Sequence, residues 1–134
     1  MKFLLILFFF AASCTSRKDS FFTKADKVEI CFFNGGDTLR TEGMSKQLML
    51  DMDRLLNEPA IPTDCVATGY IYFYVNNRVV YGINFSTLET GAAEKCQSLI
   101  MENKEWRLTN DMKMFLDETY YDLKKTYERY NKNQ

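Results

Sequence analysis

The chain has 134 residues, with 17 lysines and arginines against 18 aspartates and glutamates, no histidine and four cysteines. The formal net charge of -1 argues against a protein that binds nucleic acid or coats an anionic membrane. Because histidine is absent, the usual general base, the commonest zinc ligand and every Ser-His or Cys-His nucleophile are excluded.

The first 13 residues (MKFLLILFFFAAS) have the three parts of a secretory signal. Lys2 provides the positive start, residues 3–10 are apolar, and small residues follow. Such a run reaches only about 15 Å, half of a bilayer's hydrocarbon core, so a membrane-spanning helix is disfavoured. We therefore expect residues 1–13 to be a signal peptide.

Ala11-Ala12-Ser13-Cys14 resembles the lipobox of bacterial lipoproteins, although the usual leucine three positions before the cysteine is replaced by Ala11. The resemblance implies a lipid on Cys14 that anchors the protein stably in the bacterial cell envelope. The expected membrane is the outer one, with the protein on its periplasmic or surface face. Ordinary signal peptidase, which would cut at the same bond and leave Cys14 unmodified, is the alternative. We expect residues 14–26 to be a lipidated tether and residues 27–134 to be one domain.

The first half of the expected domain predicts a hairpin and then a helix. Residues 27–33 alternate as a strand, Asn34-Gly-Gly-Asp37 is a turn, and residues 38–41 can return as a second strand. Ser45 is placed to cap a helix that continues at helical spacing to Asn57. Residues 58–64 contain both prolines and are expected to be a connector.

The clearest element is a hairpin of residues 69–75 and 78–85 around Asn76-Asn77, because asparagine tolerates the positive φ of a type I′ turn. Both faces are apolar, which predicts a central position in the sheet. One face is expected to carry Tyr70, Tyr72, Tyr74, Val79, Tyr81, Ile83 and Phe85. These tyrosines could pack under a helix, stack on a sugar or grip a protein partner.

Residues 96–101 and 105–108 predict two more strands, and Thr109 or Asn110 is placed to cap the last helix. The expected apolar stripe of this helix is Met112, Phe115, Leu116, Thr119, Leu123, Tyr127 and Tyr130. The predicted fold class is α+β, with an antiparallel sheet of four to six strands and two main helices, the longer at the C-terminus.

The cysteines of an exported protein can form disulfides. With Cys14 lipidated, Cys31, Cys65 and Cys96 remain, so one bridge and one free thiol are expected. Cys65 and Cys96 flank the clearest hairpin and are the favoured partners, although all three could be buried thiols. No spacing typical of a zinc site is present, and we expect no metal or cofactor.

Two classes of function remain. The favoured one is a non-enzymatic protein-binding module on a lipid anchor: an inhibitor, an immunity protein against an incoming toxin, or an accessory to envelope assembly. The exposed turns supply its partner-binding candidates, Asp37, Asn76, Asn77 and Arg78. The alternative is an envelope hydrolase that works with carboxylates alone, from Asp51, Asp53 and Glu58 or from Asp117, Glu118 and Asp122.

Overall fold

The computed structural model of the protein describes residues 21–87, 89 and 94–134. The predicted signal peptide, Cys14 and the tether as far as residue 20 lie outside these described residues.

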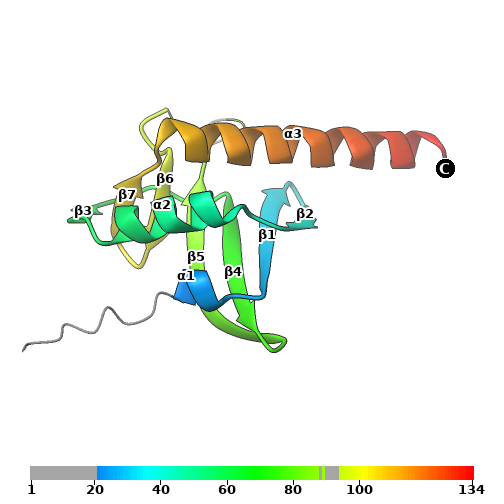
Figure 1. Ribbon diagram of the computed structural model, residues 1–134. Coiled ribbons are helices and arrows are strands. Elements are labelled where there is room, and N and C mark those ends of the chain that lie inside the picture. The colour runs from blue at the N-terminus through cyan, green and yellow to red at the C-terminus, as the bar shows by residue number, and fades with distance from the viewer. Residues whose placement is uncertain (1–20, 88, 90–93) are drawn as a thin grey trace, which may run out of the picture.

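The described chain forms an antiparallel sheet with helices, which confirms the predicted α+β class (Figure 1). The helices are α1 Phe21–Lys24, α2 Lys46–Leu56 and α3 Asn110–Lys132. The strands are β1 Lys27–Asn34, β2 Asp37–Glu42, β3 Ile61–Pro62, β4 Gly69–Val75, β5 Arg78–Ser86, β6 Ser98–Met101 and β7 Lys104–Arg107. Their order in the sheet is β2-β1-β4-β5-β6-β7-β3, with the predicted hairpin at its centre. The sheet has seven strands because part of the expected connector pairs as β3 with β7.

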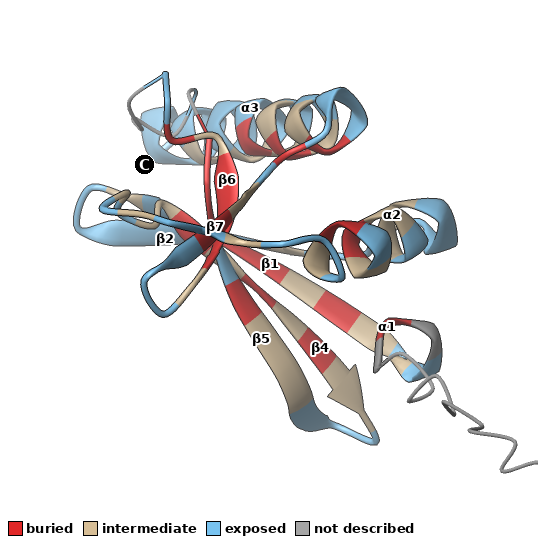
Figure 2. Ribbon diagram, turned by 90° about the vertical axis from the view of Figure 1, so that its left-hand side faces the viewer, coloured by how far each residue is buried: buried red, intermediate tan, exposed pale blue. Residues whose placement is uncertain are grey.

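All three helices lie on one side of the sheet (Figure 2). Ser45 caps α2 and Thr109 caps α3, each side chain accepting a hydrogen bond from the backbone amide three residues later. The core lies between the helices and the sheet. Its fully buried members include Ile30, Phe32, Ile71, Phe73, Phe85, Met52 and Leu116.

The register of the central hairpin differs from the expected one. Tyr74 pairs with Val79, but Phe73 pairs with Tyr81, so Val80 is an extra residue in β5. This bulge reverses the facing of the rest of β5. Tyr81, Ile83 and Phe85 therefore join the helix-covered face, and their assignment to the tyrosine face was wrong.

The stripe of α3 also differs at two positions. Tyr120 is buried against Phe32, with ring centroids 5.4 Å apart, whereas Tyr130 is 65% exposed. The C-terminal part of α3 projects past β2, where no described strand lies beneath it (Figure 1). The exposure of Tyr130 follows from this projection.

The packed structure begins before the expected boundary at Lys27. Phe22 in α1 is buried, and its ring lies 4.8 Å from that of Phe73. The backbone amide of Asp26 donates to Tyr74. The end of the expected tether is therefore part of the folded structure.

Candidate functional site

The side of the sheet away from the helices has two halves. Over β2, β1, β4 and the part of β5 that pairs with β4, no described helix covers the strands (Figure 2). We call this half the open face. The strand pairing places on it Lys27, Glu29, Cys31, Phe33, Thr38, Arg40, Glu42, Tyr70, Tyr72, Tyr74, Val79 and Asn84.

Aromatic rings form the centre of the open face. Tyr70 and Tyr72 stack with ring centroids 4.2 Å apart and ring planes at 27°. Phe33, which is 41% exposed, lies 5.9 Å from Tyr70. Gly82 leaves room for the ring of Tyr72, because a Cβ at that position would lie 2.7 Å from it. The tyrosines are half-buried side by side instead of packing under a helix.

Charged groups surround the aromatic rings. Lys27 lies 3.4 Å from a carboxylate oxygen of Glu42 and 4.6 Å from the ring centroid of Tyr74. Arg40 is exposed, and it is the cross-strand neighbour of Cys31. Both signs of charge thus surround one apolar cluster. An apolar centre with a polar rim is typical of protein–protein interfaces.

The pKa of Tyr70 is raised to about 12, chiefly by a side-chain hydrogen bond with Cys31 and then by burial. Cys31 is itself completely buried beneath its neighbours on this face. The phenol of Tyr70 therefore stays protonated at physiological pH and can donate a hydrogen bond.

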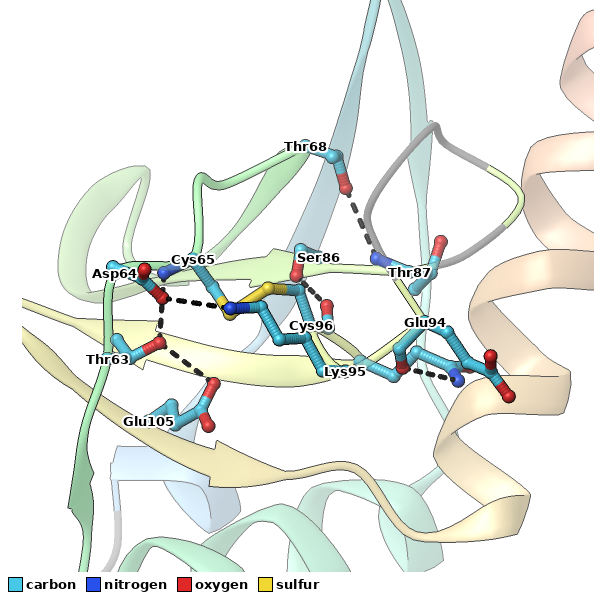
Figure 3. The surroundings of a disulfide bond; sticks show 11 residues. Thr63, Asp64, Cys65, Thr68, Ser86, Thr87, Glu94, Lys95, Cys96 and Glu105 are labelled. Carbon is cyan, nitrogen blue, oxygen red and sulfur yellow. Dashed lines mark hydrogen bonds and ion pairs between the residues drawn. A yellow bond between two sulfur atoms is a disulfide. The ribbon is translucent and has the colours of Figure 1, made fainter.

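The other half of this side is covered by the segment that carries the disulfide (Figure 3). Cys65 and Cys96 are bonded, with 5.6 Å between their Cα atoms, which is the pairing that the sequence favoured. Thr63 donates from its hydroxyl to Glu105 at 3.0 Å. Ser86 bonds to the carbonyl of Cys96 and is completely buried. This half of the sheet face is therefore covered by the protein's own chain.

The predicted turn residues do not come together. Asp37 follows β1, whereas Asn76 and Asn77 lie beyond the opposite end, because Lys27 at the start of β1 pairs with Tyr74. Asp37 also accepts a hydrogen bond from the hydroxyl of Tyr127 in α3. The two turns therefore cannot form one compact contact surface.

The turn at Asn76 and Asn77 has the expected conformation, with φ of 50° and 62°. The backbone amide of Asn76 donates to the carboxylate of Asp26 at 2.8 Å. Arg78 is exposed beside it. The turn is thus a well-ordered projection, but it lies at the margin of the open face.

The two acidic groups of the sequence lie on helix surfaces. Asp51 accepts a hydrogen bond from Gln47 and lies 3.7 Å from Arg54, and Asp53 and Glu58 are exposed or half-exposed near it. In α3, Asp117, Glu118 and Asp122 line an open hollow of about 470 Å³ together with Glu89. Burial raises the pKa of Asp117.

Among the described residues, no group of three or more Cys, Asp or Glu side chains is arranged to hold a metal ion. The helices described by the structure include none that is both long and apolar enough to span a bilayer.

Sequence reasoning missed that Arg40 and Cys31 lie beside the tyrosines. The alternating tyrosines of β4 were visible, but the simple hairpin register added three large side chains of β5 to their face. That error made the tyrosine face resemble a buried core face. The bulge at Val80 turns those three side chains to the opposite face.

No protein-family model, no curated protein and no solved structure matches this chain.

Proposed function

We propose that this protein is a binding module for another protein, that the open face is its contact surface, and that Cys14 anchors it by lipid in the bacterial envelope. The observation that carries the binding proposal is the Tyr70–Tyr72 stack, 4.2 Å between centroids and uncovered by any described helix, beside exposed Arg40. Tyrosine and arginine are the residues that most often dominate the energy of protein–protein contacts.

The shape of the open face favours a protein over a small molecule. Small ligands usually bind in concave pockets that bury most of their surface. Here the aromatic rings lie on a sheet, and Lys27, Glu29 and Glu42 provide a charged margin of both signs. A rigid sheet also loses little conformational entropy when it binds, which favours affinity.

The partner is expected to be a protein of the envelope or an incoming toxin, because the lipobox resemblance implies an anchor at the membrane. Inhibitor, immunity and assembly roles all require such a surface, and the open face serves any of them. The carboxylate hydrolase is disfavoured, since the hollow that Asp117 shares with Glu118, Asp122 and Glu89 is open to solvent, and carboxylates on a solvated helix surface are common.

Asn84 offers a sharp test, because it is exposed on the open face opposite Tyr70 and packs no core. We expect Asn84→Glu to weaken retention of an identified envelope partner at least about tenfold, equivalent to about 1.4 kcal/mol. The matched control is Asn103→Glu, which makes the same substitution at an exposed turn residue between β6 and β7, away from the open face. Retention is measured by quantitative pull-down from detergent-solubilised envelopes.

Equal retention by the Asn84→Glu variant and the unsubstituted chain would contradict the open-face proposal. If Asp117→Asn abolished retention of the partner while Asn84→Glu left it unchanged, the hydrolase would be favoured instead.

A further inference from the structure

The outer edge of β2 has backbone groups that pair with no described strand. β2 is at the end of the sheet order, and no described strand pairs with its outer side. Asn34 and Asp37 close a two-residue turn, and the amide of Gly43 donates to Val28 at the other end. The residues of β2 that bond to β1 therefore alternate from Asp37 to Gly43. Thr38, Arg40 and Glu42 direct their amides and carbonyls outward.

An exposed strand edge of this kind is a template for pairing with another strand. The charged side chains of β2 indicate which strand could pair with this edge. Arg40 and Glu42 carry opposite charges two residues apart on the same face, and both are exposed. Glu42 lies near Lys27, but its side chain is still 64% exposed.

We propose that two copies of this chain pair through β2, antiparallel, with Arg40 of each copy opposite Glu42 of the other. This register aligns the outward amides and carbonyls of both strands and places two opposite-charge pairs across the junction. Shifting the strands so that Arg40 lies opposite Arg40 would set like charges against each other. The strand is thus complementary to itself in one register.

The same register places Thr41 of one copy opposite Thr41 of the other, on the helix-covered side. Thr41 is half-buried in one copy. Threonine pairs across antiparallel strands are favourable, and their Cβ atoms lie about 5 Å apart. The junction therefore has a polar contact at its centre and charge pairs on either side.

The projecting end of α3 gives a second contact. In each copy it extends past β2 (Figure 1). Its Tyr130 is 65% exposed. Pairing of the two edges would bring this segment over the sheet of the second copy. A hollow of about 400 Å³ on each copy is lined by Glu42, Met44 and Met49 among others, at the end of β2 that would lie toward the second copy's α3 in this register. A dimer would thus cover apolar surface that one copy leaves exposed.

This proposal goes beyond the binding function and does not depend on it. Its test uses the full chain with Thr41→Cys, expressed with its own signal and oxidised with copper phenanthroline. We expect a covalent dimer on a non-reducing gel, because the two substituted positions face each other. The matched control is Thr38→Cys on the same strand, whose two copies would lie about 20 Å apart in this register. The unsubstituted chain shows the background from the natural cysteines.

Charge reversal then tests the register. In the Thr41→Cys background, Arg40→Glu and Glu42→Arg should each slow dimer formation about fivefold or more, because each sets like charges opposite. The double reversal restores opposite charges and should restore the rate. Resistance to trypsin shows that each variant is folded.

Cross-linking of Thr38→Cys but not Thr41→Cys would overturn the proposal, as would a double reversal that stays as slow as the single ones. Absence of any covalent dimer from Thr41→Cys would mean that β2 does not pair with itself, whether or not it pairs with another protein's strand.

Discussion

Cys31 and Tyr70 face each other across β1 and β4, and the interaction of the phenol with the neighbouring thiol is the largest cause of the raised pKa of Tyr70. Cys31 is completely buried, whereas Tyr70 is half-buried and stacked on Tyr72. Cys31, the free thiol among the described residues, is therefore buried beneath the aromatic cluster that we propose as the contact surface.

This pair predicts a loss of stability at high pH. The pKa of Tyr70 is raised from 10.0 to about 12 in the folded protein, so folding favours the protonated phenol. That stabilisation is complete below pH 10 and decreases as the pH rises toward 12. Burial raises the pKa of Tyr81, which acts in the same direction. We expect Tyr70→Phe to make the fall of the melting temperature over this range shallower. Identical slopes for both proteins would show that the phenol does not contribute.

Gly69 is predicted to be intolerant of any side chain. A Cβ at this position would collide with the ring of Phe85 and with the backbone carbonyl of Cys31. The carbonyl is held in the sheet and the ring of Phe85 is fully buried, so neither neighbour can move easily. Gly69→Ala should therefore lower the free energy of unfolding by about 3 kcal/mol or more. Gly36→Ala is the control, since nothing lies within 4 Å of its added Cβ. Urea unfolding of the two variants measures the difference, and equal midpoints would contradict the packing.

The disulfide is predicted to make a large contribution to stability. Cys65 and Cys96 are 31 residues apart, and closing a loop of that length restricts the unfolded chain by about 3 to 4 kcal/mol. Replacing both cysteines by serine should lower the free energy of unfolding by that amount in a urea titration. Native alkylation followed by non-reducing peptide mapping checks the pairing. Labelling of Cys65 and Cys96 without unfolding would rule the bond out.

Cys14 is predicted to carry the membrane anchor. Cys14→Ala should abolish incorporation of a clickable fatty acid and release the protein from the membrane fraction, because a thioether lipid needs this sulfur. Thr15→Ala, one residue further along, should keep the label. Label retained on the Cys14→Ala protein would contradict the lipoprotein hypothesis and leave ordinary secretion as the alternative.

The sequence by itself determined the local elements. Asn34-Gly-Gly-Asp37 and Asn76-Asn77 produced the two tight hairpins, and Ser45 and Thr109 capped the two main helices. These features depend on a few neighbouring residues, whose backbone preferences are the same in any fold. The α+β class followed because alternating and helical periodicities were both strong.

Only the tertiary structure decided which surfaces are covered. The bulge at Val80 turns Tyr81, Ile83 and Phe85 to the side that the helices cover, and no local sequence pattern indicated it. Burial of Phe22 and Tyr120 likewise required contacts with Phe73 and Phe32, which are distant in the chain. Periodicity shows that a strand has two faces, but the placement of the other elements decides which one remains open. For that reason the tyrosines of β4 could be read from the sequence, while their exposure beside Arg40 could not.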